Sequence, residues 1–159
     1  MGPILKTLAL FAGVLLAQIK LADYLRLGEI RPDFILVFLV FLSARYGRLA
    51  GILGGFGAGL IQDLSGALSI LGANTLAKPI VGYTLGTLNG TTTVWTPRIM
   101  NLYVYGALLV HAVVFQAAMS LGLQMPIGVL VKRIVLETFI SSTLVTGLRY
   151  MVPLLPARA

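Results

Sequence analysis

Apolar residues run along this chain in long segments that are separated by short polar stretches. An apolar run of this kind that is long enough to cross a bilayer is typical of a membrane-spanning helix. We predict an all-α, polytopic transmembrane bundle of about six helices, with all of 1–159 forming one transmembrane domain. The predicted helices are 4–22, 34–44, 49–62, 72–88, 99–123 and 127–155.

The connections between these segments differ in polarity. The stretch 20–33 is the most polar part of the chain and predicts a solvated or headgroup-level loop. Pro32 suits the first turn of the following helix, and Asp33 adds negative charge at its N-terminus. The stretch 64–71 contains Ser65, Gly66 and Ser69, so it either crosses the membrane or re-enters from one side.

Composition supports a membrane environment. Of the 159 residues, 58% are hydrophobic and 11% are charged, and the mean hydropathy is +0.96. A water-soluble domain usually carries about 25% charged residues. The first segment lacks a clear cleavage pattern for a signal peptide, and we expect it to be retained as the first span.

The charges are mostly basic, with twelve Lys plus Arg against five Asp plus Glu. They are scattered among apolar segments, which argues against nucleic-acid binding and favours positive-inside topology with attraction to anionic lipids. Six spans place both termini on one side of the membrane. That side would hold Lys6, Arg45, Arg48, Arg98, Arg149 and Arg158, and the other side Lys20, Arg26 and Arg31. We therefore predict that both termini are cytoplasmic.

Small residues recur every four positions in three of the segments, which places them on one face of each helix. Such faces let helix backbones touch inside a membrane, either within the bundle or against a partner helix. The sequence is compatible with packing inside the bundle and with packing against a partner. The three rows are Ala9, Gly13 and Ala17; Gly47, Gly51, Gly55 and Gly59; and Gly82 and Gly86.

Two charged residues beside strongly apolar sequence, Asp63 and Lys78, are the best candidates for a polar site. An unpaired charge inside a bilayer is costly, so we predict that the two are partners. With Gln62 and Asn74 they form either a partner-binding or ligand-binding site at a helix break, or a pair that closes a helical hairpin.

The remaining polar residues have simpler interpretations. Arg133 and Glu137 are one helical turn apart and are predicted to pair. His111, the single histidine, is predicted to make a helix-to-helix hydrogen bond. The chain has no cysteine, and it contains no phosphate-binding loop, zinc pattern, paired carboxylates or nucleophile elbow. We predict that it is no enzyme and carries no metal or cofactor.

The block from Arg31 to Gly86 resembles the bacterial cell-shape protein family MreD. The resemblance rests on the combined order of several short features. These are Arg31-Pro32-Asp33, Arg45-Tyr46-Gly47-Arg48, the glycine-rich run ending Gly59-Leu60-Ile61-Gln62-Asp63, and then Gly72, Lys78, Gly82 and Tyr83.

This resemblance implies an inner-membrane subunit of the elongasome, or rod complex, that supports lateral peptidoglycan synthesis. Its implied partners are the transmembrane helix of MreC, the glycosyltransferase RodA with its penicillin-binding transpeptidase, and indirectly MreB. The family is also similar in architecture to the S components of energy-coupling-factor transporters. The alternative function is therefore a small-molecule-binding subunit of a vitamin-type transporter, which would need a concave pocket with several convergent polar groups.

Overall fold

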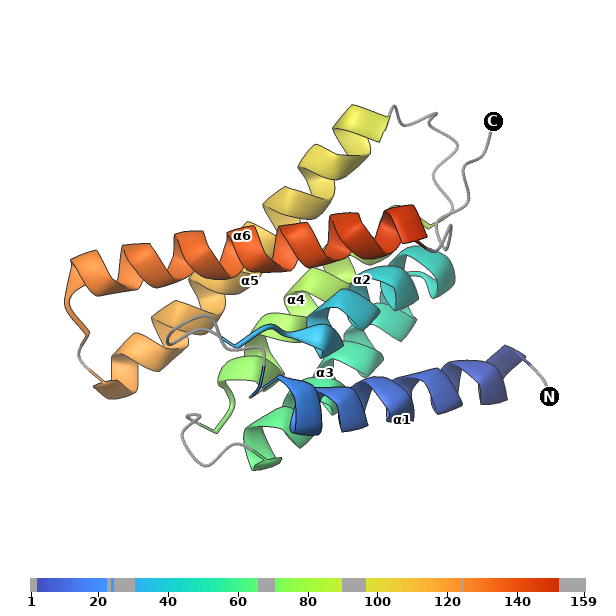
Figure 1. Ribbon diagram of the computed structural model, residues 1–159, viewed down its shortest axis with the longest axis horizontal. Helices are drawn as coiled ribbons and strands as arrows, with labels where there is room; N and C mark the ends of the chain where they lie inside the picture. Colours follow the sequence, from blue (N-terminus) through green and yellow to red (C-terminus); the bar gives the residue numbers. More distant parts are fainter. Residues whose placement is uncertain are drawn as a thin grey trace.

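The computed structural model describes residues 3–22, 24, 31–65, 71–89, 97–123 and 125–151. Within these ranges the chain is helical and contains no strand, which confirms the all-α prediction. The predicted helix boundaries agree within a few residues; the predicted extension of the last helix to 155 lies outside the described residues. The helices in Figure 1 are α1 (Pro3–Leu21), α2 (Phe34–Tyr46), α3 (Arg48–Ser65), α4 (Ala73–Gly86), α5 (Pro97–Leu123) and α6 (Ile127–Met151).

Helix α4 occupies the centre of the bundle, where it contacts α2, α3 and α5. Helix α2 is also internal, since Ile35 through Phe41 are all buried. Helix α1 packs against α2, and α6 lies across α5 (Figure 1). The apolar core joins α2, α4, α5 and α6 through Leu36, Val37, Val40, Phe41, Val81, Leu85, Val104, Ala107, Leu108 and Val145.

The contact between α3 and α4 is a glycine seam in which backbone touches backbone. A Cβ added at Gly51 would collide with the carbonyl of Gly82, and a Cβ at Gly86 would collide with the backbone of Arg48. A Cβ at Gly55 would lie 2.8 Å from the Lys78 carbonyl, and one at Gly59 would lie 2.6 Å from the Asn74 carbonyl oxygen. The spacing of four in both helices therefore serves this close approach.

The turn between α2 and α3 requires a glycine. Gly47 has φ +86°, a left-handed conformation that side chains other than glycine rarely tolerate. Asn89, which follows α4, donates from Nδ2 to the carbonyl oxygens of Ala44 and Arg45 and so satisfies the exposed end of α2. Arg45 and Arg48 are exposed at this end, with Arg48 over the ring of Tyr83.

Large apolar side chains cover the outside of the bundle. They are exposed on every helix except α2, where Tyr46 at the C-terminal end is the exposed large hydrophobic side chain. Hydrocarbon is the solvent in which such a surface is stable. Examples are Leu5, Leu10 and Leu16 on α1; Leu49, Leu53, Phe56, Leu60 and Leu64 on α3; Leu76 and Ile80 on α4; Ile99, Leu102, Leu109, Val113 and Leu121 on α5; and Ile127, Val131, Val135 and Phe139 on α6.

Helix lengths divide the bundle into long and short members. Among the described residues, one segment, Arg98–Leu121 in α5, is both long and apolar enough by itself to cross a membrane. By contrast, α2 has 13 residues and α4 has 14, which gives each a length of about 20 Å against a hydrocarbon core of about 30 Å. At least one end of each short helix therefore lies within the depth that α5 crosses.

The glycine seam predicts a strong contrast between two neighbouring alanine substitutions. Gly55→Ala forces the α4 backbone away and should lower the unfolding free energy by about 1–3 kcal/mol. Gly57→Ala is the matched control, because a Cβ there has no neighbour within 4 Å; it should be neutral or stabilise the helix by up to about 1 kcal/mol. Unfolding in mixed detergent and SDS measures both. Equal stability of the two variants would contradict the seam.

Candidate functional site

The ends of three helices meet inside the bundle and bring polar residues together. Helices α2 and α4 begin here, and α3 ends here. The first turn of a helix has backbone N–H groups without partners in the helix, and a low-dielectric interior offers no water to bind them. Side chains must therefore satisfy these groups. Asp33 and Asp63 accept from N–H groups of this kind. With the side chains that these two carboxylates bind, which are Asn74, Thr75 and Lys78, they form the polar cluster.

Asp63 binds the start of α4 with both carboxylate oxygens. Its Oδ2 accepts from the backbone N–H of Gly72 at 3.0 Å and of Thr75 at 2.9 Å, and from the Thr75 hydroxyl at 2.7 Å. Its Oδ1 accepts from the Asn74 backbone at 3.2 Å and from the Asn74 side chain at 2.9 Å. The side chain of a neighbouring helix thus replaces a local cap, which Gly72 cannot supply.

Asp33 holds the start of α2 and neutralises the buried lysine. Its Oδ1 accepts from the backbone N–H of Leu36 at 2.8 Å, and its Oδ2 pairs with Lys78 Nζ. Lys78 has 0% relative exposure and also donates to Asn74 Oδ1 at 2.9 Å. The predicted pairing of Lys78 with Asp63 is therefore wrong. Lys78 pairs with Asp33, and Asn74 connects the two halves of the cluster.

Helix α1 is attached to the same region through Gln18. Its Oε1 accepts from the backbone N–H of Phe34 at 2.8 Å, and its Nε2 donates to the Pro32 carbonyl at 3.2 Å. Nothing in the sequence distinguishes Gln18 as a functional residue, because a lone glutamine in an apolar segment does not indicate what it binds. Gln62 was expected to join the cluster, but its buried Oε1 makes no hydrogen bond within the described part of the chain.

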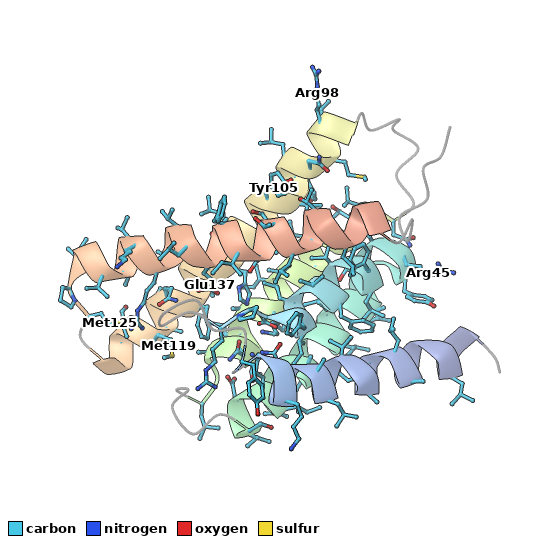
Figure 2. All side chains as sticks on the ribbon, viewed as in Figure 1. Arg45, Arg98, Tyr105, Met119, Met125 and Glu137 are labelled. Atoms are coloured by element: carbon cyan, nitrogen blue, oxygen red, sulfur yellow. The ribbon has the colours of Figure 1, made fainter. Side chains whose placement is uncertain are left out.

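A second polar contact lies between α5 and α6. Gln116 Nε2 donates to Glu137 Oε2 at 2.8 Å, and His111 Nδ1 lies 3.4 Å from Glu137 Oε1. Figure 2 shows Glu137 on the side of α6 that faces α5. The predicted pairing of Glu137 with Arg133 is wrong, since the carboxylate faces the neighbouring helix. The predicted helix-to-helix hydrogen bond of His111 is also wrong, because its ring nitrogens make no hydrogen bond among the described residues, although the ring lies beside Glu137 of α6.

The predicted small-residue faces are placed differently from one another. Gly51, Gly55 and Gly59 of α3 face Gly82 and the rest of α4, and Gly86 faces the start of α3. Ala9 and Gly13 on α1 are exposed, whereas Ala17 is half-buried. A Cβ added at Gly13 has no neighbouring atom within 4 Å. Contact of any of these residues with a partner stays a prediction.

An apolar exterior combined with charges gathered at internal helix ends defines the class, which is an all-helical membrane protein. The family of the rod shape-determining protein MreD matches residues 2–155. The chain therefore belongs to the MreD family, as its central block suggested, and has a role in determining cell shape. No curated protein and no solved structure matches the chain.

The pairing of Asp33 with Lys78 predicts a clear double-mutant result. Lys78→Met leaves the Asp33 carboxylate buried beside an apolar side chain and should lower the unfolding free energy by about 3–5 kcal/mol. Adding Asp33→Asn removes the unpaired charge while keeping a helix cap, and should restore most of this loss. Unfolding in detergent gives the three values.

Lys132→Met is the matched control for the lysine change, because Lys132 is exposed on α6. Its effect on stability should be within about 0.5 kcal/mol of zero. If the Asp33→Asn/Lys78→Met protein were no more stable than Lys78→Met alone, the ion pair would have no special role in the interior.

Proposed function

We propose that this protein is a non-catalytic, multi-pass scaffold subunit of the elongasome in the bacterial inner membrane. In this role it binds MreC and supports lateral peptidoglycan synthesis together with RodA and its penicillin-binding transpeptidase partner, and indirectly with MreB. Membership of the MreD family carries the proposal, since it establishes the role in cell shape.

A structural role for the buried charges supports the non-catalytic part of the proposal. Asp63 binds the start of α4, and Asp33 holds the start of α2 while neutralising Lys78. These groups are occupied by helix ends and by one another. Their hydrogen bonds and ion pair therefore fix how α2, α3 and α4 pack together.

The arrangement of helix ends supports several membrane crossings. In Figure 1 the start of α1, the turn between α2 and α3, and the end of α6 lie toward the same side of the bundle. Arg45 and Arg48 are exposed at this turn. Because basic residues favour the cytoplasmic face, we assign this side, and with it both termini, to the cytoplasm.

The outer face of α1 is the surface we assign to the transmembrane helix of MreC. Helix α1 contacts the bundle through the hydrogen bonds of Gln18 and through the ring of Phe11, whose centroid lies 5.4 Å from that of Phe38. Ala9 and Gly13 remain exposed, and small residues at this spacing allow a second helix to approach closely. The glycines of α3 and α4 already face each other inside the bundle, so we do not assign them to the contact with MreC.

The transporter alternative ranks second. It needs a concave pocket with convergent polar groups. Two hollows in the described part of the molecule are open grooves on its outside. One is lined by residues of α4 and α5 such as Thr84, Leu102 and Tyr103, and the other by Tyr105 and residues of α6 such as Phe139 and Thr146. Neither groove contains a member of the polar cluster.

The test is co-purification of MreC with Gly13→Leu in mild detergent. A leucine at this open position keeps the bundle intact but separates the two helices, and the recovered MreC should fall by roughly tenfold, the equivalent of about 1.4 kcal/mol. Gly57→Leu is the matched control, because a Cβ at Gly57 also meets no atom within 4 Å but lies on α3. Size-exclusion profiles establish that both variants are folded.

The two variants distinguish the outer face of α1 from the outer face of α3 as the surface that binds MreC. Full recovery of MreC with folded Gly13→Leu would exclude the α1 face. Loss with Gly57→Leu alone would move the interface to the outer face of α3.

A further inference from the structure

An open groove lies on the outside of the bundle, where the end of α4 meets the first half of α5. Its volume is about 410 Å³. Gly106 is exposed, and a Cβ added there would have no neighbouring atom within 4 Å. The absence of a side chain at Gly106 therefore leaves room in the groove for a bound molecule. Helix α4 supplies Thr84 to the lining, and α5 supplies residues such as Ile99, Leu102, Tyr103, Gly106 and Ala107.

The lining of the groove suits hydrocarbon. The Thr84 hydroxyl donates to the carbonyl oxygen of Ile80 at 2.8 Å. The Tyr103 hydroxyl donates to the Thr84 carbonyl oxygen at 2.9 Å and lies 2.7 Å from the Thr87 hydroxyl. These polar groups are therefore bonded inside the protein, whereas Leu102 is 72% exposed. An apolar chain fits such a surface, and a polar solute would gain few hydrogen bonds there.

Two arginines lie beside the groove, on the helices that flank α4. Arg98 directly precedes Ile99 at the start of α5, is exposed, and points away from the bundle in Figure 2. On α3, the guanidinium carbon of Arg48 lies 5.6 Å from the ring centroid of Tyr83, which is the neighbour of Thr84 in α4. Positive charge is therefore present on both sides of the exposed face of α4.

The described carboxylates lie away from these arginines. Asp33 and Asp63 belong to the polar cluster at the start of α4, whereas the groove lies at its end. Glu137 contacts the middle of α5. Within the described part of the chain, neither Arg48 nor Arg98 has an ion pair. At the edge of a bilayer, lipid phosphates are the anions that meet such side chains.

We propose that this groove binds one anionic phospholipid. An acyl chain lies along Leu102 and Gly106, and Arg98 holds the headgroup phosphate, with Arg48 adding positive charge from the other side of α4. A guanidinium group can bind phosphate through two N–H donors at once, which favours a lipid that stays in place. A helix of another protein would also cover the apolar lining, but it would leave both arginines without an anion.

This lipid site is separate from the surface proposed for MreC. That surface is the outer face of α1, which packs against α2, whereas the groove lies between α4 and α5. Loss of lipid binding and loss of MreC binding therefore test different parts of the molecule.

Native mass spectrometry of the purified protein in mild detergent tests the lipid site. The probes are phosphatidylglycerol and phosphatidylcholine with identical acyl chains, added at equal concentrations. The wild type should retain a single phosphatidylglycerol molecule in preference to phosphatidylcholine. Arg98→Gln should weaken the binding of phosphatidylglycerol by roughly fivefold, which corresponds to about 1 kcal/mol for one basic residue near anionic lipid.

A second variant tests the apolar part of the groove. Gly106→Leu places a side chain in the open space and should lower the binding of phosphatidylglycerol. Gly128→Leu is the matched control, because a Cβ at Gly128 on α6 also meets no atom within 4 Å. Lys132→Gln is the control for the lost charge, since Lys132 is exposed on α6. Both controls should bind phosphatidylglycerol as the wild type does.

Equal retention of the two lipids by the wild type would overturn the proposal, and this result needs no variant. Wild-type retention of phosphatidylglycerol by folded Gly106→Leu and folded Arg98→Gln would overturn it as well. A wild-type dimer that Gly106→Leu separates into monomers would assign the groove to a second copy of the chain and would also exclude the lipid.

Discussion

The fold depends on satisfying the first turns of two short helices inside a bundle that lacks water. Helices α2 and α4 begin where their N–H groups have no solvent to bind. Asp33 and Asp63 provide the acceptors, and Gln18 adds one more. Each carboxylate brings a negative charge, which the positive end of the helix dipole and Lys78 offset. Because the capping residues come from α1, α2 and α3, satisfying these groups also fixes how four helices meet.

Close approach of α3 and α4 is the geometric condition for that meeting. Asp63 can reach the backbone of Thr75 only because Gly59 lets the α4 backbone come within contact of α3 next to Asn74. Glycine is a poor helix former in water, and each one costs about 1 kcal/mol relative to alanine. In this bundle the absence of side chains at the glycines lets α3 and α4 touch. It also lets the Asp63 carboxylate, near the end of α3, form its hydrogen bonds with α4. The seam and the polar cluster are consequently one structural unit.

The positions of the helices follow from local sequence patterns, whereas the contacts between residues of different helices do not. Apolar runs and the Pro32-Asp33 start located the helices, and the glycine spacing indicated close packing. The partners of the charged side chains were harder to predict. Lys78 is predicted to pair with Asp63 because both charges lie beside strongly apolar sequence, but Asp33, 45 residues away, arrives with α2. Glu137 was matched with Arg133 by helical spacing, yet it faces α5. Spacing reports which residues share a face, and it contains no information about what lies opposite.

The two kinds of polar contact suggest a division within the molecule. In the polar cluster, opposite charges and backbone donors are matched at fixed distances, so that α2, α3 and α4 form a stiff centre. Between α5 and α6, the carboxylate of Glu137 faces the ring of His111 and the amide of Gln116, and few apolar side chains of α6 are buried with it. Helix α6 is therefore attached less firmly than α2, α3 and α4 are to one another, and Val145 is the side chain that joins it to the apolar core. The stiff centre suits the scaffold role that we propose, because a partner needs a surface of constant shape.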